Sequence, residues 1–141
     1  MPERVDLMGH LAGRVRAAFE AADLSAVADL LDPHVHWGPP GSTSPPCRTR
    51  DQVISWYRRE KEAGARARVL EALVLGDRIL IGLRVSGART AHPVGAAQER
   101  WQVLTVGDGR IVDIVGFEQR DEAVACATTA SVPSEPPAIP G

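Results

Sequence analysis

The amino-acid sequence predicts one α+β domain, in which amphipathic helices cover one face of a four-stranded antiparallel sheet. Apolar residues follow the helical period of 3.6 up to about residue 63 and the strand period of two from residue 66 onwards. Helices that precede a run of hairpins are typical of an α+β fold rather than of repeated βαβ units. A curved sheet wrapped around a long N-terminal helix predicts a cone-shaped fold with an internal pocket.

The first two predicted helices lie at the N-terminus. Apolar side chains recur at spacings of three and four residues from Met8 to Ala22. Asp23 is placed to cap a short second helix, Leu24 to Leu31. Pro33 ends it, because proline disfavours helical geometry in the residue before it.

A short strand, a loop and a third helix follow. The alternating segment His34 to Trp37 predicts one strand, and the four prolines of Gly38 to Arg48 predict an irregular loop. Thr49 and Gln52 match a capping box that opens the third helix. This helix is expected to end near Ala63.

Two β-hairpins complete the predicted sheet. Residues 66–75 and 78–86 are joined by Gly76-Asp77, and residues 98–106 and 110–118 are joined through Gly107-Asp108-Gly109. A short terminal helix is expected over 121–127. The sequence thus predicts a domain over residues 1–127 and a disordered, proline-rich tail over residues 128–141.

The composition excludes several classes of protein. The formal charge of −2 leaves no basic excess for binding nucleic acid, and no apolar run approaches the length of a membrane span. The first ten residues contain no apolar signal segment, and the two cysteines are far apart. We therefore expect a cytoplasmic protein with no nucleic-acid partner and no membrane partner.

Three blocks of the sequence resemble the nuclear transport factor 2-like superfamily and, within it, the SnoaL-like (polyketide cyclase-like) family. They are AAFEAADLSAVADLLDPHVHWGPPG (residues 17–41), TRDQVISWYRR (residues 49–59) and ERWQVLTVGDGRIVDIVGFEQRDEAV (residues 99–124). The resemblance implies the cone fold, and many members of the superfamily form homodimers. It leaves the activity open, because this fold carries isomerases, cyclases, hydrolases, dehydratases and binding modules.

The resemblance implies that the catalytic groups of known relatives are incomplete here. The position of the ketosteroid isomerase base looks like Gly38, and the acidic position of the SnoaL-type cyclases looks like Gly116. The arginine of limonene epoxide hydrolase maps to Arg84. The same comparison places the even-numbered residues of the first strand, including His36, inside the cavity.

Three residues are the candidate catalytic groups. His36 is predicted to act as a general acid or base near neutral pH. Arg84 and Glu118 are predicted to be inner-face polar anchors, Arg84 for a carboxylate or enolate oxygen and Glu118 for proton transfer or for orienting Arg84. The alternatives are a structural histidine and an arginine–glutamate pair that only closes the cone.

Five of the six aromatic residues fall in segments expected to surround the cavity, and they are candidate substrate-binding residues: Trp37, Trp56, Tyr57, Trp101 and Phe117. Core packing is the alternative for each of them. His34 and His36 have metal-ligand spacing on a strand, but only His92 offers a further ligand, so we expect neither a metal nor another cofactor.

The leading hypothesis is a small enzyme that acts on an apolar polyketide- or terpenoid-like secondary metabolite. Its reaction would be proton transfer without a cofactor, such as cyclisation, isomerisation or dehydration. The alternative is a non-catalytic module of the same fold that binds a small molecule or serves as a dimeric interaction scaffold. A homodimer is expected in either case.

Overall fold

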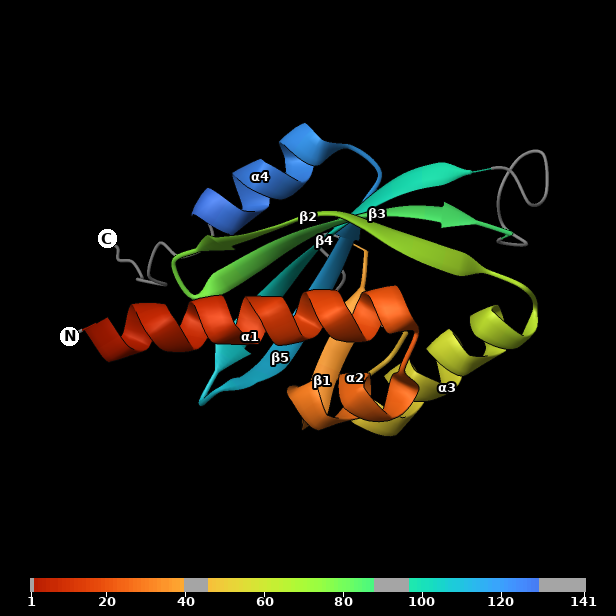
Figure 1. The fold of residues 1–141 in the computed structure, drawn as a ribbon, viewed down its shortest axis with the longest axis horizontal. Helices are drawn as coiled ribbons and strands as arrows, with labels where there is room; N and C mark the ends of the chain where they lie inside the picture. The colour runs from red at the N-terminus through yellow and green to blue at the C-terminus, as the bar shows by residue number, and fades with distance from the viewer. Residues whose placement is uncertain (1, 40–45, 88–96, 130–141) are drawn as a thin grey trace, which may run out of the picture.

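The computed structural model describes residues 2–39, 46–87 and 97–129, and this part of the chain contains four helices and five strands (Figure 1). The helices are α1 (Pro2–Ala21), α2 (Leu24–Leu30), α3 (Arg50–Glu62) and α4 (Arg120–Thr129). The strands are β1 (Leu31–Gly38), β2 (Arg66–Leu75), β3 (Arg78–Ser86), β4 (Gln98–Gly107) and β5 (Arg110–Phe117). The predicted order of elements is confirmed.

The five strands form one sheet in the order β1-β5-β4-β3-β2. β2 to β5 are antiparallel neighbours, as the two hairpins predict. The structure adds a fifth strand, since β1 pairs parallel to β5 and makes the sheet mixed. The parallel pair brings the N-terminal half of the chain against its last strand.

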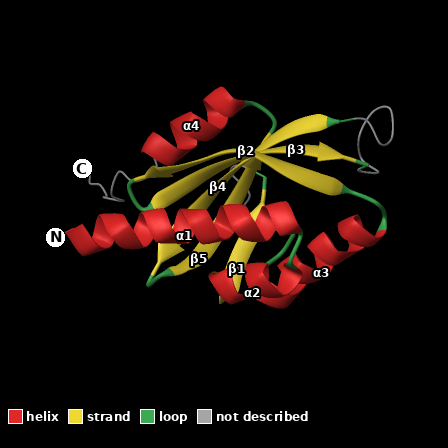
Figure 2. Ribbon diagram, viewed as in Figure 1, coloured by secondary structure: helices red, strands yellow, loops and turns green. Residues whose placement is uncertain are grey.

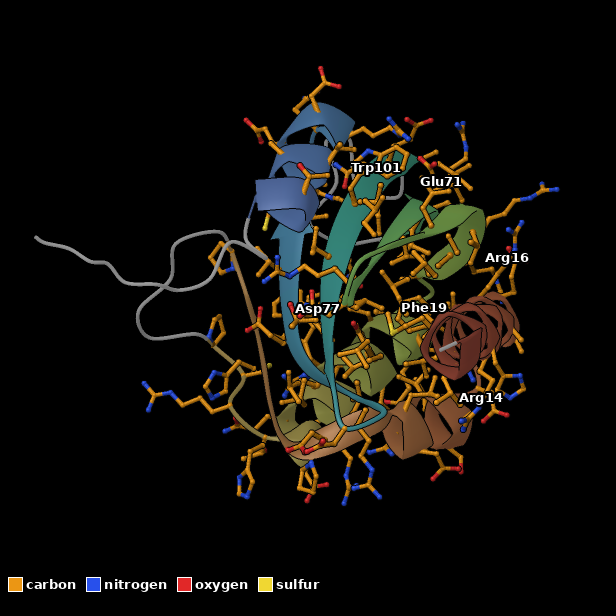
Figure 3. The ribbon with its side chains drawn as sticks, turned by 90° about the vertical axis from the view of Figure 1, so that its left-hand side faces the viewer. Arg14, Arg16, Phe19, Glu71, Asp77 and Trp101 are labelled. Carbon is orange, nitrogen blue, oxygen red and sulfur yellow. The ribbon has the colours of Figure 1, made fainter. Side chains whose placement is uncertain are left out.

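Helices cover the sheet unequally on its two faces (Figures 1 and 2). α1, α2 and α3 lie on one side, which we call the inner face, and α4 lies on the other, the outer face. Figure 3 shows Phe19 on the side of α1 that faces the sheet, whereas Arg14 and Arg16 point away from it. The predicted amphipathic character of α1 is therefore confirmed.

Side-chain caps fix the starts of α2 and α3, as predicted. The Asp23 carboxylate accepts a hydrogen bond from the amide of Ala26 (3.1 Å), and the Thr49 hydroxyl accepts one from the amide of Gln52 (3.2 Å). The Gln52 side chain accepts from the amide of Arg48 (2.6 Å) rather than from that of Thr49. The second hydrogen bond of the capping box is therefore made with the residue before the N-cap, Arg48, instead of with the N-cap itself.

The two hairpin turns use residues that tolerate positive φ. Gly76 has φ +65° in the first turn, and Asp108 and Gly109 have φ +54° and +79° in the second. Two central residues with positive φ define a two-residue turn that matches the twist of the flanking strands. The predicted three-residue link through Gly107 is therefore one residue shorter, because Gly107 still belongs to β4.

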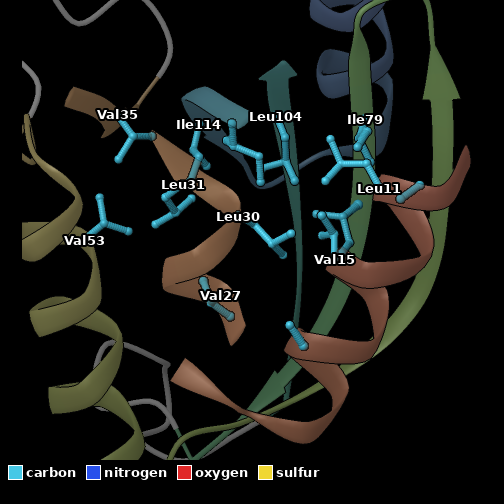
Figure 4. Close-up of a cluster of buried hydrophobic side chains, with 14 of the residues drawn as sticks. Leu11, Val15, Val27, Leu30, Leu31, Val35, Val53, Ile79, Leu104 and Ile114 are labelled. Carbon is cyan, nitrogen blue, oxygen red and sulfur yellow. The ribbon is translucent and has the colours of Figure 1, made fainter. Parts of the chain in front are cut away.

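The main core lies between the inner face and the first three helices (Figure 4). Its fully buried members include Val15, Leu31, Val35, Ile79 and Leu104. Burial of such side chains stabilises the fold by roughly 1.5–3 kcal/mol each. This core fixes α1 and α2 against the middle of the sheet.

A smaller core lies on the outer face beneath α4. Leu80, Trp101 and Val103 of the sheet are buried there against Ala123 and Ala127 of α4. The arrangement depends on Gly82, because a Cβ at that position would lie 2.1 Å from the Trp101 ring.

An ion pair and a cation–π contact hold α4 over this core. Arg120 donates two hydrogen bonds to the Glu71 carboxylate, at 2.6 and 3.2 Å, and its guanidinium lies 5.7 Å from the centre of the Trp101 ring. Figure 3 shows Glu71 and Trp101 on the same side of the molecule as α4.

Two predictions concern the ends of the chain. The predicted tail falls mainly on residues 130–141, which lie outside the described part of the chain. Thr128 and Thr129 belong to α4. Among the described helices, none has both the length and the apolar character that crossing a bilayer requires.

Candidate functional site

An apolar cavity of about 710 Å³ lies between the inner face of the sheet and helices α1 to α3. This volume is within the usual range for small-molecule pockets, roughly 300–1,000 Å³. Its apolar walls come from Phe19, Leu24, Val27, Leu83 and Val85. These walls come from the helices and the strands between which the sequence predicts a pocket.

Aromatic side chains form one wall of the cavity. The rings of Trp37 and Trp56 are 4.8 Å apart, and Tyr57 contacts Trp56 edge-on at 5.8 Å and Phe19 at 6.1 Å. The backbone of Trp37 is held by a two-way bridge to Cys47, with N···O distances of 3.0 and 3.3 Å. The sequence prediction that Trp37, Trp56 and Tyr57 border the cavity agrees with this geometry.

Three buried polar atoms belong to side chains that line this cavity. They are the indole Nε1 of Trp37, the hydroxyl of Tyr57 and the amide oxygen Oε1 of Gln102. The side chains come from three elements, β1, α3 and β4. None of the three atoms has a hydrogen-bond partner of good geometry among the described residues.

The surroundings of Tyr57 keep its hydroxyl protonated. Burial raises the pKa of Tyr57 well above its usual range, while the nearby Gln102 and Trp37 side chains act in the opposite direction. A neutral hydroxyl can donate a hydrogen bond to an oxygen that gains negative charge.

Charged residues of the cavity include an ion pair between neighbouring inner-face positions. Arg100 lies 3.1 Å from the Glu118 carboxylate and donates a hydrogen bond to Gln98 (2.9 Å). The Glu118 side chain is 76% exposed, whereas that of Arg100 is 33% exposed. Lys61 also lines the cavity and donates to the carbonyl oxygen of Ala22 (2.9 Å).

The prediction that His36 faces the cavity is wrong. His36 is the register partner of Asp113 on β5, and Trp37 is the partner of Ile114, whose side chain belongs to the inner core. Residues that pair across neighbouring strands share a face, so His36 lies on the outer face and is exposed. The odd-numbered residues Val35 and Trp37 point inward instead.

The predicted pairing of Arg84 with Glu118 is also wrong. Arg84 is the register partner of Glu99, and the two side chains approach to 4.0 Å, each 55% exposed. Arg84 alternates with the inward-pointing Leu83 and Val85, which places it on the outer face. Glu118 lines the cavity as predicted, but its partner is Arg100.

Trp101 and Phe117 contact both the cavity and the outer core. They are register partners and both border the cavity. Both also pack into the outer core beneath α4, where Trp101 is 7% exposed. Core packing therefore accounts for much of the surface of these two rings.

Sequence reasoning missed Gln102 and Arg100. The signal was the recurrence of polar residues at positions 98, 100 and 102 of one strand, in which Glu99 and Thr105 are the other polar side chains. Residues two apart on a strand share a face, so this spacing indicates a polar stripe on the inner face. Gly116 lies opposite Gln102, and a Cβ there would meet nothing within 4 Å.

A metal site requires at least three ligand side chains close together. Within residues 7–39, 46–87 and 97–128, no three His, Cys, Asp or Glu side chains lie close enough to hold a metal ion. His92, the third candidate ligand, lies outside these ranges.

The chain is similar to one known domain family. The family model described as SnoaL-like domain matches residues 12–114. No curated protein matched the chain.

Solved structures share the fold at low sequence identity. A protein named "putative polyketide cyclase" from Sinorhizobium meliloti is 22% identical, with a TM-score of 0.59 over 77% of this chain and 94% of that chain. Bal32a from a soil-derived mobile gene cassette is 20% identical, with a TM-score of 0.66 over 84% and 94%. An NTF2-like protein of unknown function from Mesorhizobium loti is 23% identical, with a TM-score of 0.64 over 82% and 93%.

Proposed function

Since the chain belongs to the SnoaL-like domain family, we propose that it is a small enzyme that promotes proton transfer, without a cofactor, on an apolar polyketide- or terpenoid-like metabolite. The observation that carries the proposal is the neutral Tyr57 hydroxyl, buried in the wall of an apolar cavity. The cavity is large enough for a molecule of several rings. Similarity to a protein named as a polyketide cyclase supports the substrate class.

The proposed reaction begins with removal of a proton from a carbon next to a carbonyl group. The Glu118 carboxylate takes the proton, and the electron pair of the C–H bond forms a C=C bond. The carbonyl π electrons then move to oxygen, and the Tyr57 hydroxyl donates a hydrogen bond to this enolate. Return of the proton to a different carbon of a conjugated enolate completes an isomerisation. In a cyclisation, the enolate carbon attacks a second carbonyl group, and the alkoxide that forms takes the proton back from Glu118.

Arg100 is given a positioning role in this scheme. Its guanidinium holds the Glu118 carboxylate at 3.1 Å and is itself held by Gln98. Without it, an exposed glutamate side chain has many accessible rotamers, and a base must lie within hydrogen-bond reach of the proton that it takes.

Hydrogen exchange tests the enzyme proposal without the natural substrate. The bicyclic ketone 1-tetralone is incubated with protein in heavy water, and deuterium at the carbon next to the carbonyl is followed by NMR. We expect Glu118→Gln to slow the protein-dependent exchange by about 10²–10⁴-fold. Tyr57→Phe is expected to slow it by about 10²–10³-fold.

Two control variants separate the site from the rest of the fold. Gly116→Phe fills open space next to Gln102 and is expected to abolish exchange by blocking the cavity. Arg68→Gln alters an exposed residue outside the cavity and is expected to leave exchange unchanged. Exchange that persists in both Glu118→Gln and Tyr57→Phe contradicts the proposed mechanism.

The second candidate function is a binding module. It is favoured by the 76% exposure of Glu118, because a base in contact with water gains little from an apolar site. Saturable binding of 1-tetralone that Gly116→Phe abolishes, with no protein-dependent exchange, would establish this alternative.

A further inference from the structure

We infer that the cavity selects neutral ligands that carry both a carbonyl group and a hydroxyl group, recognised by Trp37, Tyr57 and Gln102 together. This inference deepens the proposed function and rests on it. It concerns which ligand is chosen, and it holds for an enzyme and for a binding module alike.

The three polar atoms are complementary to such a ligand. The Trp37 indole is a donor only, the Tyr57 hydroxyl donates and accepts, and Gln102 Oε1 accepts only. A carbonyl oxygen has two lone pairs, which match the two donors. A hydroxyl hydrogen on the ligand matches the amide oxygen, so each of the three atoms gains a partner.

The three side chains border one cavity. Trp37 contacts Trp56 with ring centres 4.8 Å apart, and Trp56 contacts Tyr57 at 5.8 Å, so Trp37 and Tyr57 belong to one aromatic wall. Gln102 lines the same cavity from β4. We therefore expect one ligand that carries a carbonyl and a hydroxyl group to pair with all three side chains.

The Gln102 side chain has room to turn toward a ligand. The polar atoms are closed off from solvent, so binding a ligand requires a change of side-chain rotamer in the cavity wall. Gly116, the register partner of Gln102, leaves open space beside the Gln102 amide. Unpartnered buried polar groups are unfavourable, which favours the rotated state when a ligand supplies partners.

The same surroundings reject an anionic head group. Burial disfavours the charged form of Tyr57 and disfavours a ligand carboxylate at that point for the same reason. Of the cations that line the cavity, Arg100 is held by Glu118 and Gln98, Lys61 donates to the Ala22 carbonyl oxygen, and Arg66 is exposed to solvent. We therefore expect neutral hydroxy-ketones to bind and aromatic carboxylates of equal size to be excluded.

Three probes of one size test the inference: 1-tetralone, 2-hydroxy-1-tetralone and 1-naphthoate. Their dissociation constants for the full chain are measured by titration calorimetry. One additional hydrogen bond is worth roughly fivefold in affinity. We expect 2-hydroxy-1-tetralone to bind about fivefold more tightly than 1-tetralone, and 1-naphthoate to bind more weakly than both.

Variants assign the preference to the named side chains. Gln102→Leu is expected to remove the preference for the hydroxy-ketone while 1-tetralone still binds. Tyr57→Phe is expected to weaken both ketones, since both carry the carbonyl oxygen. If Gln102→Leu fails to fold, Gln102→Met keeps the length of the side chain and removes the same acceptor.

The outcomes separate this inference from the proposed function. Equal affinity for the two ketones, or a preference that survives loss of the Gln102 oxygen, overturns the inference even where deuterium exchange proceeds. Tighter binding of the naphthoate also overturns it. A Gln102-dependent preference without any exchange supports the inference and contradicts the enzyme proposal.

Discussion

The two faces of the sheet differ in how completely they are packed. The outer face is closed by α4, with Trp101 packed over Gly82 and Arg120 bound to Glu71. The inner face keeps a cavity of about 710 Å³ and leaves three buried polar atoms without good partners. Among the described residues, the outer face is thus packed without a cavity, whereas the inner face carries the main core and gives up some stability to keep its cavity.

The largest expected loss of stability comes from a substitution in the outer core. Trp101 is 7% exposed and spans the space between Gly82 and α4. Trp101→Ala leaves a large void and is expected to lower the free energy of unfolding by about 3–5 kcal/mol. Urea unfolding followed by circular dichroism measures this change, and a loss below that of Gly82→Ala contradicts the comparison.

Gly82→Ala tests the same contact from the other side. The new Cβ would lie 2.1 Å from the Trp101 ring, so the ring or the strand has to move. Overpacking of this kind typically costs about 1–3 kcal/mol. Thermal unfolding measures this loss of stability. Gly109→Ala does not serve as a control, because Gly109 has a φ of +79° that alanine would adopt only with strain. Gly13→Ala on α1, which meets nothing within 4 Å, is the matched control.

A substitution on the inner face, unlike the two on the outer face, is expected to leave the stability unchanged or to raise it. Gln102→Leu removes a buried oxygen that has no good partner and keeps most of the side-chain volume. We expect the free energy of unfolding to stay equal or to rise by about 1 kcal/mol while the preference for the hydroxy-ketone is lost. A clear loss of stability would show that Gln102 is bonded within the fold, and would count against an unpartnered inner face.

A smaller effect concerns Asp113, on the outer face opposite His36. Burial raises the pKa of Asp113 from 3.8, against the attraction of His36 and Arg78. A carboxyl whose pKa is higher in the folded state adds stability below its unfolded pKa, and that stability is lost as the pH rises through the folded value. A further titratable neighbour is Cys126, whose pKa burial also raises.

Asp113→Asn removes this pH dependence. At pH 3 both the aspartic acid and the asparagine are neutral, and we expect little change in the unfolding midpoint. At pH 7 the variant is expected to be the more stable protein, because the buried carboxylate is gone. Thermal scans at the two pH values measure the difference, and a destabilised variant at pH 7 would show that attraction to His36 and Arg78 outweighs burial.

The sequence alone determined the elements and their caps, because these depend on local interactions. Asp23 and Thr49 cap their helices by reaching amides three residues away. The turn at Gly76 needs a positive φ that glycine provides at no steric cost. The alternation along residues 66–117 defines the hairpins without reference to the rest of the chain. These features were predicted to within a few residues.

The tertiary structure decided which face each functional side chain occupies. A shift of one residue in register reverses every side chain of a strand, and the parallel pairing of β1 with β5 is set by contacts far apart in the sequence. That register turned His36 outward and Trp37 inward. The pairing of β4 with β5 placed Gln102 beside Gly116 and let Arg100, rather than Arg84, meet Glu118. The sequence determined which polar groups are present, and long-range strand pairing determined which of them share the cavity.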